Sequence, residues 1–322
     1  MSISKEDRSH PYIVAFGGGT GMHCLLTGLK EVTPNLTCVV TVTDDGGSSG
    51  LLRSDLDIPP PGDLRNCLLA LSEAPPLLRQ ALEWRFPTGE LNGHNLGNLL
   101  IAAATLIKGD LGEAVKELHE VLSVKGRVLP STTKKVSLVA YHADGTTTAG
   151  EVRISKSRRP IHKLELKPNP GPASPEIIEA IERADFFVFG PGSLFTSIIP
   201  NLLIPGVVEA IRRSAKPVIL VGNIMTQPAE TEGFSLADHI CAFERHSGEG
   251  FLHAVVACES DLPESVLQAY RKEGAEPVRI DRERIKNVRL IVGDLAEVDR
   301  VVRHHPHKLA ETILKAASWV RT

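Results

Sequence analysis

The chain has 322 residues, of which 42% are apolar and 23% are charged, and its formal net charge at pH 7 is −3. This length allows a large buried core in one α/β domain or in two smaller ones, and the small net charge gives no general attraction to nucleic acid or to an anionic membrane. The five cysteines are scattered without a CxxC pair, the N-terminal segment is polar, and no apolar run is long enough to span a bilayer, so we expect a cytoplasmic protein without a disulfide framework, a zinc site or a membrane anchor.

Short apolar runs alternate with helical patterns along the chain. The first strand, Ile13–Phe16, leads through a glycine turn into a helix that ends near Glu31, and Cys38–Thr43 follows as a second strand. Further strands are expected at Phe186–Phe189, Val218–Val221, Leu252–Ala257 and Val288–Val292, before a last helix from about His307 to Val320. Alternation of this kind predicts an α/β fold with a doubly wound, mostly parallel, Rossmann-like sheet covered on both faces.

Two segments interrupt the alternation. Residues 64–124 contain no convincing strand and predict a helical insertion. Residues 134–166 carry three β-like runs, Val136–Tyr141, Thr146–Ile154 and Ile161–Leu166, which predict a small β excursion. We therefore expect a single Rossmann-like domain over residues 1–322 with these two additions.

The glycine turn Gly17–Gly21 joins the first strand to the first helix, where backbone N–H groups and the helix N-terminus can meet a phosphate. The spacing matches GxGxxG only in part, because Met22 occupies the third glycine position, and no Lys-Ser/Thr pair completes a Walker A loop. By itself the turn leaves two alternatives open, nucleotide binding and close helix–strand packing.

The segment 41–50, Thr-Val-Thr-Asp-Asp-Gly-Gly-Ser-Ser-Gly, follows the second strand and is the most informative part of the chain. An acidic residue at this point of a dinucleotide fold holds the ribose hydroxyls. A pair of carboxylates, Asp44 and Asp45, could equally hold Mg²⁺ that bridges to phosphate oxygens. The third alternative is a turn in which Asp44 accepts hydrogen bonds from local backbone N–H groups.

Polar residues also gather at two helix entrances. Asp63 is the expected N-cap of a helix that begins near residue 64, and Arg53 and Arg65 could pair with the aspartates or hold a phosphate. His94 lies among three asparagines before the helix Leu96–Leu106, as a candidate ligand or proton-transfer group. The His-rich tract 303–308 is interpreted as a solvated helix start.

Two more loops follow strands in the second half, 190–197 and 221–227, and both contain glycine with Asn, Ser or Thr. Ligands of open α/β sheets bind outside the carboxyl ends of the strands, so these loops are expected to converge on one cleft with the loops 17–21 and 41–50. The candidate catalytic residues are Asp44, Asp45 and His94, of which the two aspartates are also the candidate metal ligands. The candidate ligand-binding residues are Gly18, Gly19, Thr20, Gly21, Ser48, Ser49, Arg53, Asp63, Arg65, Asn66, Asn95, Asn98, Gly190, Gly192, Ser193, Thr196, Ser197, Asn201, Asn223, Thr226 and Gln227.

Six sequence blocks carry a resemblance to a known family. They are residues 17–21, 43–50, 61–68, 93–98, 190–197 and 223–227. In their order and their residues they resemble the gluconeogenesis-factor branch of the CofD-like family, which is the 2-phospho-L-lactate transferase family. The resemblance runs from Ile13 to about Leu309. It implies a Rossmann-like core and a cytoplasmic bacterial protein that is needed for cell shape on gluconeogenic carbon sources, binds UDP-sugars such as UDP-N-acetylglucosamine and is linked to peptidoglycan synthesis.

The resemblance also implies an enzymatic alternative. CofD enzymes transfer a phospholactyl group from a guanosine diphosphate-activated donor to a deazaflavin with Mg²⁺, and the double-aspartate block is where metal and phosphates lie, which corresponds to Asp44 and Asp45. The sequence of residues 46–49 resembles that of the gluconeogenesis-factor branch and argues against deazaflavin transfer. The alternatives are thus a regulatory UDP-sugar-binding protein, a Mg²⁺-dependent transferase acting on a nucleotide-diphosphate-activated donor such as a GDP derivative, and an NAD(P)-dependent oxidoreductase. We expect a homodimer, with proteins of peptidoglycan synthesis as candidate partners.

Overall fold

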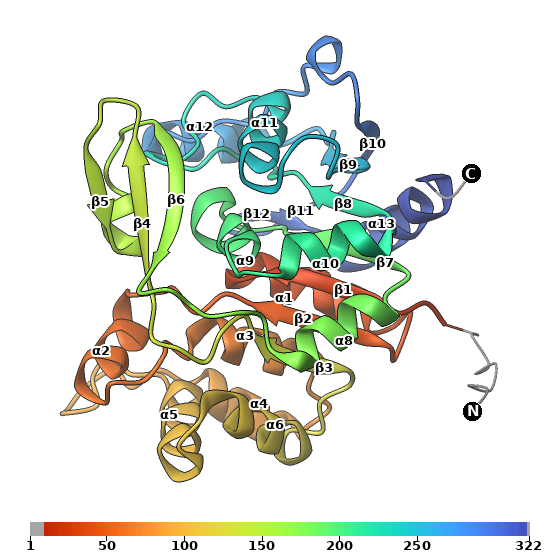
Figure 1. Cartoon of the computed structure of the whole chain (residues 1–322). Helices are drawn as coiled ribbons and strands as arrows, with labels where there is room; N and C mark the ends of the chain where they lie inside the picture. Colours follow the sequence, from red (N-terminus) through yellow and green to blue (C-terminus); the bar gives the residue numbers. More distant parts are fainter. Residues whose placement is uncertain (1–9, 321–322) are drawn as a thin grey trace, which may run out of the picture.

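The computed structural model describes residues 10–320 and contains a seven-stranded sheet in the order β10-β9-β8-β7-β1-β2-β3 (Figure 1). Every neighbouring pair in this sheet is parallel. The strands are β1 (Ile13–Gly17), β2 (Leu36–Val40), β3 (Arg127–Pro130), β7 (Phe186–Phe189), β8 (Val218–Val221), β9 (Ala254–Cys258) and β10 (Arg289–Gly293). The predicted α/β class with a doubly wound, mostly parallel sheet is confirmed.

Alternate residues of the central strands pack into two separate cores. Val14 and Phe16 of β1 belong to one core, and Ile13 and Ala15 of the same strand belong to the other. Because successive strand side chains point to opposite faces, a strand buried on both faces must be apolar throughout. This explains the continuous apolar runs by which the strands were recognised.

Helices cover both faces. One core is completed by α1 (Gly19–Leu29), α3 (Gly62–Leu71), α6 (Leu111–Val121) and α13 (Pro306–Val320). The opposite core is completed by α8 (Pro175–Arg183), α9 (Ile199–Leu202), α10 (Val207–Ser214) and α11 (Leu236–Ser247), together with the π-helical turn η1 (Leu194–Ile198). At the C-terminal side, α12 (Glu264–Glu273), η2 (Arg282–Arg284) and the antiparallel pair β11 (Ala296–Val298) and β12 (Val302–His304) complete the described part.

The segment that was expected to be helical contains α3, α4 (Pro76–Glu83), α5 (Leu96–Lys108) and α6, preceded by α2 (Gly47–Asp55). In Figure 1, α4, α5 and α6 lie together below the sheet. The expected N-cap role of Asp63 is wrong, because α3 begins at Gly62 after Pro61 and Asp63 lies inside its first turn. An acidic residue in that place still interacts favourably with the helix dipole.

Strand β3 was not predicted from the sequence. It follows α6 directly and adds to the edge of the sheet beside β2. Only four residues long and ending in a proline, it has the length and composition of an edge strand, where a missing N–H is tolerated. Such a short, half-buried run gives little periodic signal.

The β excursion forms a separate antiparallel sheet in the order β5-β4-β6, with β4 (Ser137–His142), β5 (Thr147–Ala149) and β6 (Ile161–Lys167). The predicted β run Thr146–Ile154 is wrong in its second half, since residues Glu151–Ile154 form the short helix α7. Gly150 adopts a φ of +97°, which ends the extended chain there. In Figure 1 the excursion and α2 lie on the same side of the molecule.

The chain order places a topological switch between β1 and β7. From β1 the chain continues to β2 and β3 on one side, whereas β7, β8, β9 and β10 extend the sheet on the other. The carboxyl ends of β8, β7, β1 and β2 therefore lie side by side at one edge, the usual ligand position in such sheets. Within residues 10–320, no single helix combines the length and the apolar composition needed to cross a membrane.

Candidate functional site

Two adjoining cavities lie at the carboxyl ends of these four strands. The glycine-turn cavity has a volume of 410 Å³ and is lined by Gly18–Gly21, Cys24, Pro191–Ser193, Ser197, Asn223–Pro228, Tyr270, Glu273, Ala275 and Val302–His304. The acidic cavity has a volume of 420 Å³ and is lined by Gly19, Thr20, Asp44, Asp63, Asn66, Glu151, Ser155, Ser193, Thr196, Ser197, Gln227, Pro228 and Glu230. Both volumes are in the range of small-molecule sites, and the shared residues, which include Gly19, Thr20 and Ser193, make the two cavities one cleft.

The N-terminus of α1 opens on this cleft. Its N-cap is Gly18, which has no side chain to accept a hydrogen bond, and its first turn contains no acidic residue. The amide of Gly19 donates to the Asp63 carboxylate, which approaches from α3. Gly18 has no side chain that could cap the first-turn amides that follow Gly19, and with the helix dipole these amides provide an anion-binding position.

Four carboxyl groups surround the acidic cavity, Asp44, Asp63, Glu151 and Glu230, and no lysine or arginine lines it. Burial and the neighbouring charge of Asp44 raise the pKa of Asp63 to about 7. Burial, followed by the charges of Asp44 and Asp45, raises the pKa of Glu151 to about 7 as well. This wall therefore holds protons near neutral pH, or it attracts a cation.

Glu230 connects the acidic cavity to a second glycine turn, residues 190–193, which follows β7. Its Oε1 accepts a hydrogen bond from Phe195 N at 2.9 Å and another from Ser193 Oγ. Only 7% of Glu230 is exposed, and burial raises its pKa. The buried carboxyl group thus holds the start of η1 in position beside the first glycine turn.

The residues present fit Mg²⁺ better than a metal with an all-protein ligand set. Among residues 10–320, no three His, Cys, Asp or Glu side chains converge closely enough to hold a metal ion by themselves. Asp44 and Asp63 are close enough for the charge of one to raise the pKa of the other. One or two carboxylates combined with phosphate oxygens and water form the usual ligand set of Mg²⁺.

Many of the sequence-predicted residues line the cleft. They are Gly18, Gly19, Thr20, Gly21, Asp44, Asp63, Asn66, Gly192, Ser193, Thr196, Ser197, Asn223, Thr226 and Gln227. They come from the loops after β1, β2, β7 and β8 and from the start of α3. The expected convergence of the four strand-end loops is thus present in the structure.

A second group lies outside both cavities and forms a polar network between α2, α3 and α5. Asn98 Nδ2 donates to Ser48 Oγ at 3.3 Å and to Ser49 Oγ at 3.4 Å. Arg65 Nη1 donates to Asn98 Oδ1 at 3.0 Å, and Asn95 caps α5 by accepting from Asn98 N at 3.1 Å. His94 belongs to the same network, with its Nδ1 3.4 Å from Ser48 Oγ. The network fastens the helical insertion to the loop that carries Asp44.

Four more predicted residues are also outside the cavities. Arg53 donates to Val136 O and to Ser137 Oγ, both at 2.7 Å, and so holds the start of the β excursion. Asp45 Oδ1 accepts a hydrogen bond from the Val152 amide in α7. Gly190 N donates to Phe16 O, and the fully buried Asn201 donates to Ser197 O from beneath the cleft.

Sequence reasoning missed several residues that line the cleft. Glu151 and Ser155 lie in or next to α7, which was expected to be a strand, and Glu230 follows Gln227 by three residues in a loop already singled out. Tyr270, Arg303 and His304 line the glycine-turn cavity. The tract 303–308 is therefore not simply a solvated helix start, because His304 is buried and its Nε2 has no hydrogen-bond partner.

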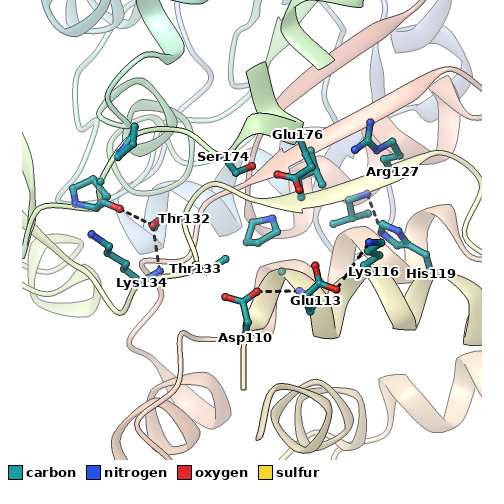
Figure 2. A pocket seen from close by; sticks show the side chains of 17 residues that line it. Asp110, Glu113, Lys116, His119, Arg127, Thr132, Thr133, Lys134, Ser174 and Glu176 are labelled. Atoms are coloured by element: carbon teal, nitrogen blue, oxygen red, sulfur yellow. Dashed lines mark hydrogen bonds and ion pairs between the residues drawn. The ribbon is translucent and has the colours of Figure 1, made fainter. Parts of the chain in front are cut away.

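A separate cavity of 490 Å³ lies along the outer edge of β3. Figure 2 shows Asp110 and Glu113 at the start of α6 across from Ser174 and Glu176 at the start of α8. Asp110 and Ser174 already cap these helices. His119 Nε2 accepts a hydrogen bond from the Val128 amide of β3 at 3.1 Å. None of the sequence-predicted site residues lines this cavity, so the cleft is the candidate site.

The comparisons with known proteins identify the family. Residues 13–296 match the family described as 2-phospho-L-lactate transferase CofD. The chain is 45% identical over 309 residues to the gluconeogenesis factor of Halalkalibacterium halodurans, covering 94% of this chain and 95% of that protein. It is 42% identical over 308 residues to the gluconeogenesis factor of Bacillus subtilis strain 168, covering 94% and 97% respectively.

Solved structures agree with this relationship. The X-ray structure of a Bacillus halodurans protein superposes with a TM-score of 0.92 at 44% identity, covering 95% of this chain and all of that one. A second crystal structure, of a Bacillus halodurans protein described as a member of the UPF0052 family, gives a TM-score of 0.91 at 44% identity, covering 94% of this chain and 99% of that one. This chain therefore belongs to the CofD family and is similar over nearly its whole length to gluconeogenesis factors.

Proposed function

We propose that this chain is a regulatory gluconeogenesis factor that binds a UDP-sugar in the cleft and is required for cell shape. The observation that carries the proposal is the junction of the two glycine turns with the acidic cavity. Gly19, Thr20, Ser193 and Ser197 line both cavities, so a diphosphate on the turns would lie next to Asp44 and Asp63. The name of the relatives, gluconeogenesis factor, supports the same role.

The charges of the cleft support a diphosphate with Mg²⁺ rather than a diphosphate alone. Asp63 already accepts from the Gly19 amide and would repel a phosphate at that position. Mg²⁺ held by Asp44 and Asp63 would remove this repulsion and supply a positive charge to the phosphate oxygens. In the proposed complex, Mg²⁺ is therefore required for tight binding.

The residues that line the glycine-turn cavity suit a nucleoside and a phosphate. Arg303 is the single Lys or Arg side chain among the residues that line it. Asn223 and Gln227 offer amides for base or sugar recognition. Arg303 and Asn223 line the glycine-turn cavity and not the acidic cavity, so they distinguish the two.

Calorimetry tests the proposal directly. Purified protein is titrated with UDP-N-acetylglucosamine, GDP, NAD and NADP, each with and without Mg²⁺. We expect UDP-N-acetylglucosamine to bind in the presence of Mg²⁺ without being consumed. Tight binding of NAD with no affinity for the UDP-sugar would overturn the proposal and favour the oxidoreductase alternative, which we rank last because the buried Met22 takes the place of the third fingerprint glycine.

A second candidate function is transfer of a phosphorus-containing group from a nucleotide-diphosphate-activated donor, as the name of the family describes. The observation that favours it is the acidic cavity, since it could accommodate an acceptor and contains Asp63 and Glu151 with pKa values of about 7. Carboxyl groups titrating there are suited to proton transfer. Formation of nucleoside monophosphate from a GDP-activated donor with Mg²⁺ and an acceptor would support this function, and absence of turnover would leave the regulator.

The proposal includes three further expectations. Cys24, Cys38 and Cys67 are buried free thiols, in agreement with action in the reducing cytoplasm. The homodimer stays a prediction, which light scattering coupled to gel filtration can test. Proteins of peptidoglycan synthesis stay the candidate partners, to be tested by affinity capture in the presence and absence of UDP-N-acetylglucosamine.

A further inference from the structure

The two adjacent aspartates after β2 have different surroundings. Asp44 lines the acidic cavity, and its Oδ1 also accepts from Gly46 N at 2.9 Å. Asp45 lines neither cavity of the cleft. Its Oδ1 accepts instead from Val152 N, at 2.9 Å, across a sequence separation of 107 residues.

The Asp45 carboxylate occupies the position of an N-cap for α7. The residue at the N-cap of this helix is Gly150, whose lack of a side chain leaves the first amides without a local acceptor. A Cβ atom at Gly150 would lie 2.5 Å from Asp45 Oδ2, so the carboxylate lies directly against the backbone of the helix start. Glycine at 150 both permits the φ of +97° and leaves room for this carboxylate.

The helix that Asp45 caps carries the wall of the acidic cavity. Glu151 is the first residue of α7 and lines that cavity, and so does Ser155 directly after the helix. Ser155 Oγ donates to Glu151 O at 3.0 Å and is 3.4 Å from Glu151 Oε1. With four residues, α7 is too short to be stable without contacts to the rest of the protein.

We propose that Asp45 is a positioning residue that caps α7 from the loop after β2 and thereby holds Glu151 on the wall of the acidic cavity, leaving Asp44 as the aspartate of the pair that faces the ligand. The role that this assignment gives to the cavity rests on the proposed function. The contact between Asp45 and α7 is independent of that function. It revises the expectation that both aspartates hold metal.

The first test measures the contact itself in the full-length protein without ligand. Hydrogen exchange is compared among wild type, Asp45→Asn and Asp45→Ala. An Asn side chain can accept the same hydrogen bond, so we expect wild-type protection of the amides of residues 152–155 in Asp45→Asn and about fivefold faster exchange in Asp45→Ala. Equal protection in Asp45→Ala and wild type would overturn the proposal.

The second test measures Mg²⁺-dependent binding of UDP-N-acetylglucosamine by calorimetry. We expect Asp45→Asn to keep its affinity within about threefold, whereas the matched variant Asp44→Asn loses at least tenfold. Asp45→Ala should weaken binding as much as Glu151→Ala does. The double variant should bind no more weakly than Glu151→Ala alone, because both changes remove the Glu151 carboxylate from its position on the cavity wall. A loss in Asp45→Asn as large as in Asp44→Asn would show that the charge of Asp45 acts on the ligand and would overturn the assignment.

The two tests allow the proposed function and the role of Asp45 to be rejected independently of each other. If wild type binds no nucleotide with Mg²⁺, the proposed function fails, and hydrogen exchange still decides whether Asp45 holds α7. If Asp45→Ala does not fold, the calorimetry of Asp45→Asn still decides whether the charge of Asp45 acts on the ligand, and so the assignment stays testable.

Discussion

The Asp63 carboxylate of α3 lies directly against the backbone of Gly18 at the start of α1. A Cβ atom at Gly18 would come within 2.5 Å of Asp63 Oδ2 and 2.7 Å of Thr41 Cγ2. The amide of the next residue, Gly19, donates to the same carboxylate. The first glycine turn, the end of β2 and the start of α3 thus pack as one unit, and glycine is required at 18 for the approach of a carboxylate.

The first prediction concerns this contact. Gly18→Ala should destabilise the protein by about 1–3 kcal/mol, because the added methyl group overlaps an acidic side chain and a threonine in a packed region. Urea unfolding followed by circular dichroism measures the change. Adding Asp63→Ala to Gly18→Ala removes one of the two overlapping groups, so the effects of the two substitutions should be less than additive. Strict additivity would contradict the direct contact.

The second prediction concerns pH. Between the unperturbed pKa of 3.8 and the raised value of about 7, Asp63 keeps its proton in the folded protein and loses it in the unfolded chain. The folded state then binds more protons, so the free energy of unfolding falls as the pH rises from about 4 to about 7. The contribution of Asp63 is on the order of 4 kcal/mol.

Asp63→Asn provides the control for this pH dependence. Asparagine resembles the protonated acid and does not titrate, so the variant should lose part of the decrease in stability between pH 4 and pH 7. Urea unfolding of the protein without ligand at pH 4.5, 6 and 7.5 gives the comparison. Parallel stability curves for wild type and Asp63→Asn would mean that Asp63 titrates normally.

The sequence contained enough information for the core of the sheet and for the position of the cleft. The strands β1, β7 and β8 are buried on both faces and therefore apolar throughout, which makes them easy to recognise. Parallel strands end at the same edge, so polar loops after them had to converge. Strand β3 lacked this signal, since only alternate residues of it are buried.

Which side chains face the cleft could not be predicted, because that depends on contacts between distant segments. Asp44 and Asp45 are adjacent and chemically identical, and only the position of α7, more than a hundred residues away, gives Asp45 another partner. Arg53 has the chemistry of a phosphate ligand, but its guanidinium group donates to Val136 O and Ser137 Oγ. The polar tract around His304 predicts a solvated side chain, yet its carbonyl oxygen accepts from Cys24 Sγ and its ring is buried.

The third prediction concerns Arg303. Because it is the single Lys or Arg side chain that lines either cavity of the cleft, Arg303→Ala should weaken Mg²⁺-dependent UDP-N-acetylglucosamine binding about tenfold, the usual loss for one charged hydrogen bond to phosphate. Arg300→Ala is the matched control, since Arg300 is exposed and lines neither cavity. Both affinities are measured by calorimetry at two salt concentrations. Equal losses in the two variants would indicate a general charge effect and would exclude a specific contact.

The fourth prediction concerns Glu230, which bonds Ser193 and Phe195 at the second glycine turn. Glu230→Ala removes the acceptor and leaves the buried Phe195 amide without a partner, so it should destabilise the protein by about 2–3 kcal/mol. Glu230→Gln keeps an acceptor oxygen on a side chain of the same length, and it should lower the free energy of unfolding by less than half as much.

Glu232→Ala tests whether this effect is specific. Glu232 is exposed in the same loop and should change the free energy of unfolding by less than about 0.5 kcal/mol. Urea unfolding at pH 7 measures all three variants. Since Glu230 lines the acidic cavity while it fixes the turn, Glu230→Ala should also weaken UDP-N-acetylglucosamine binding, and an unchanged affinity with reduced stability would limit Glu230 to a purely structural role.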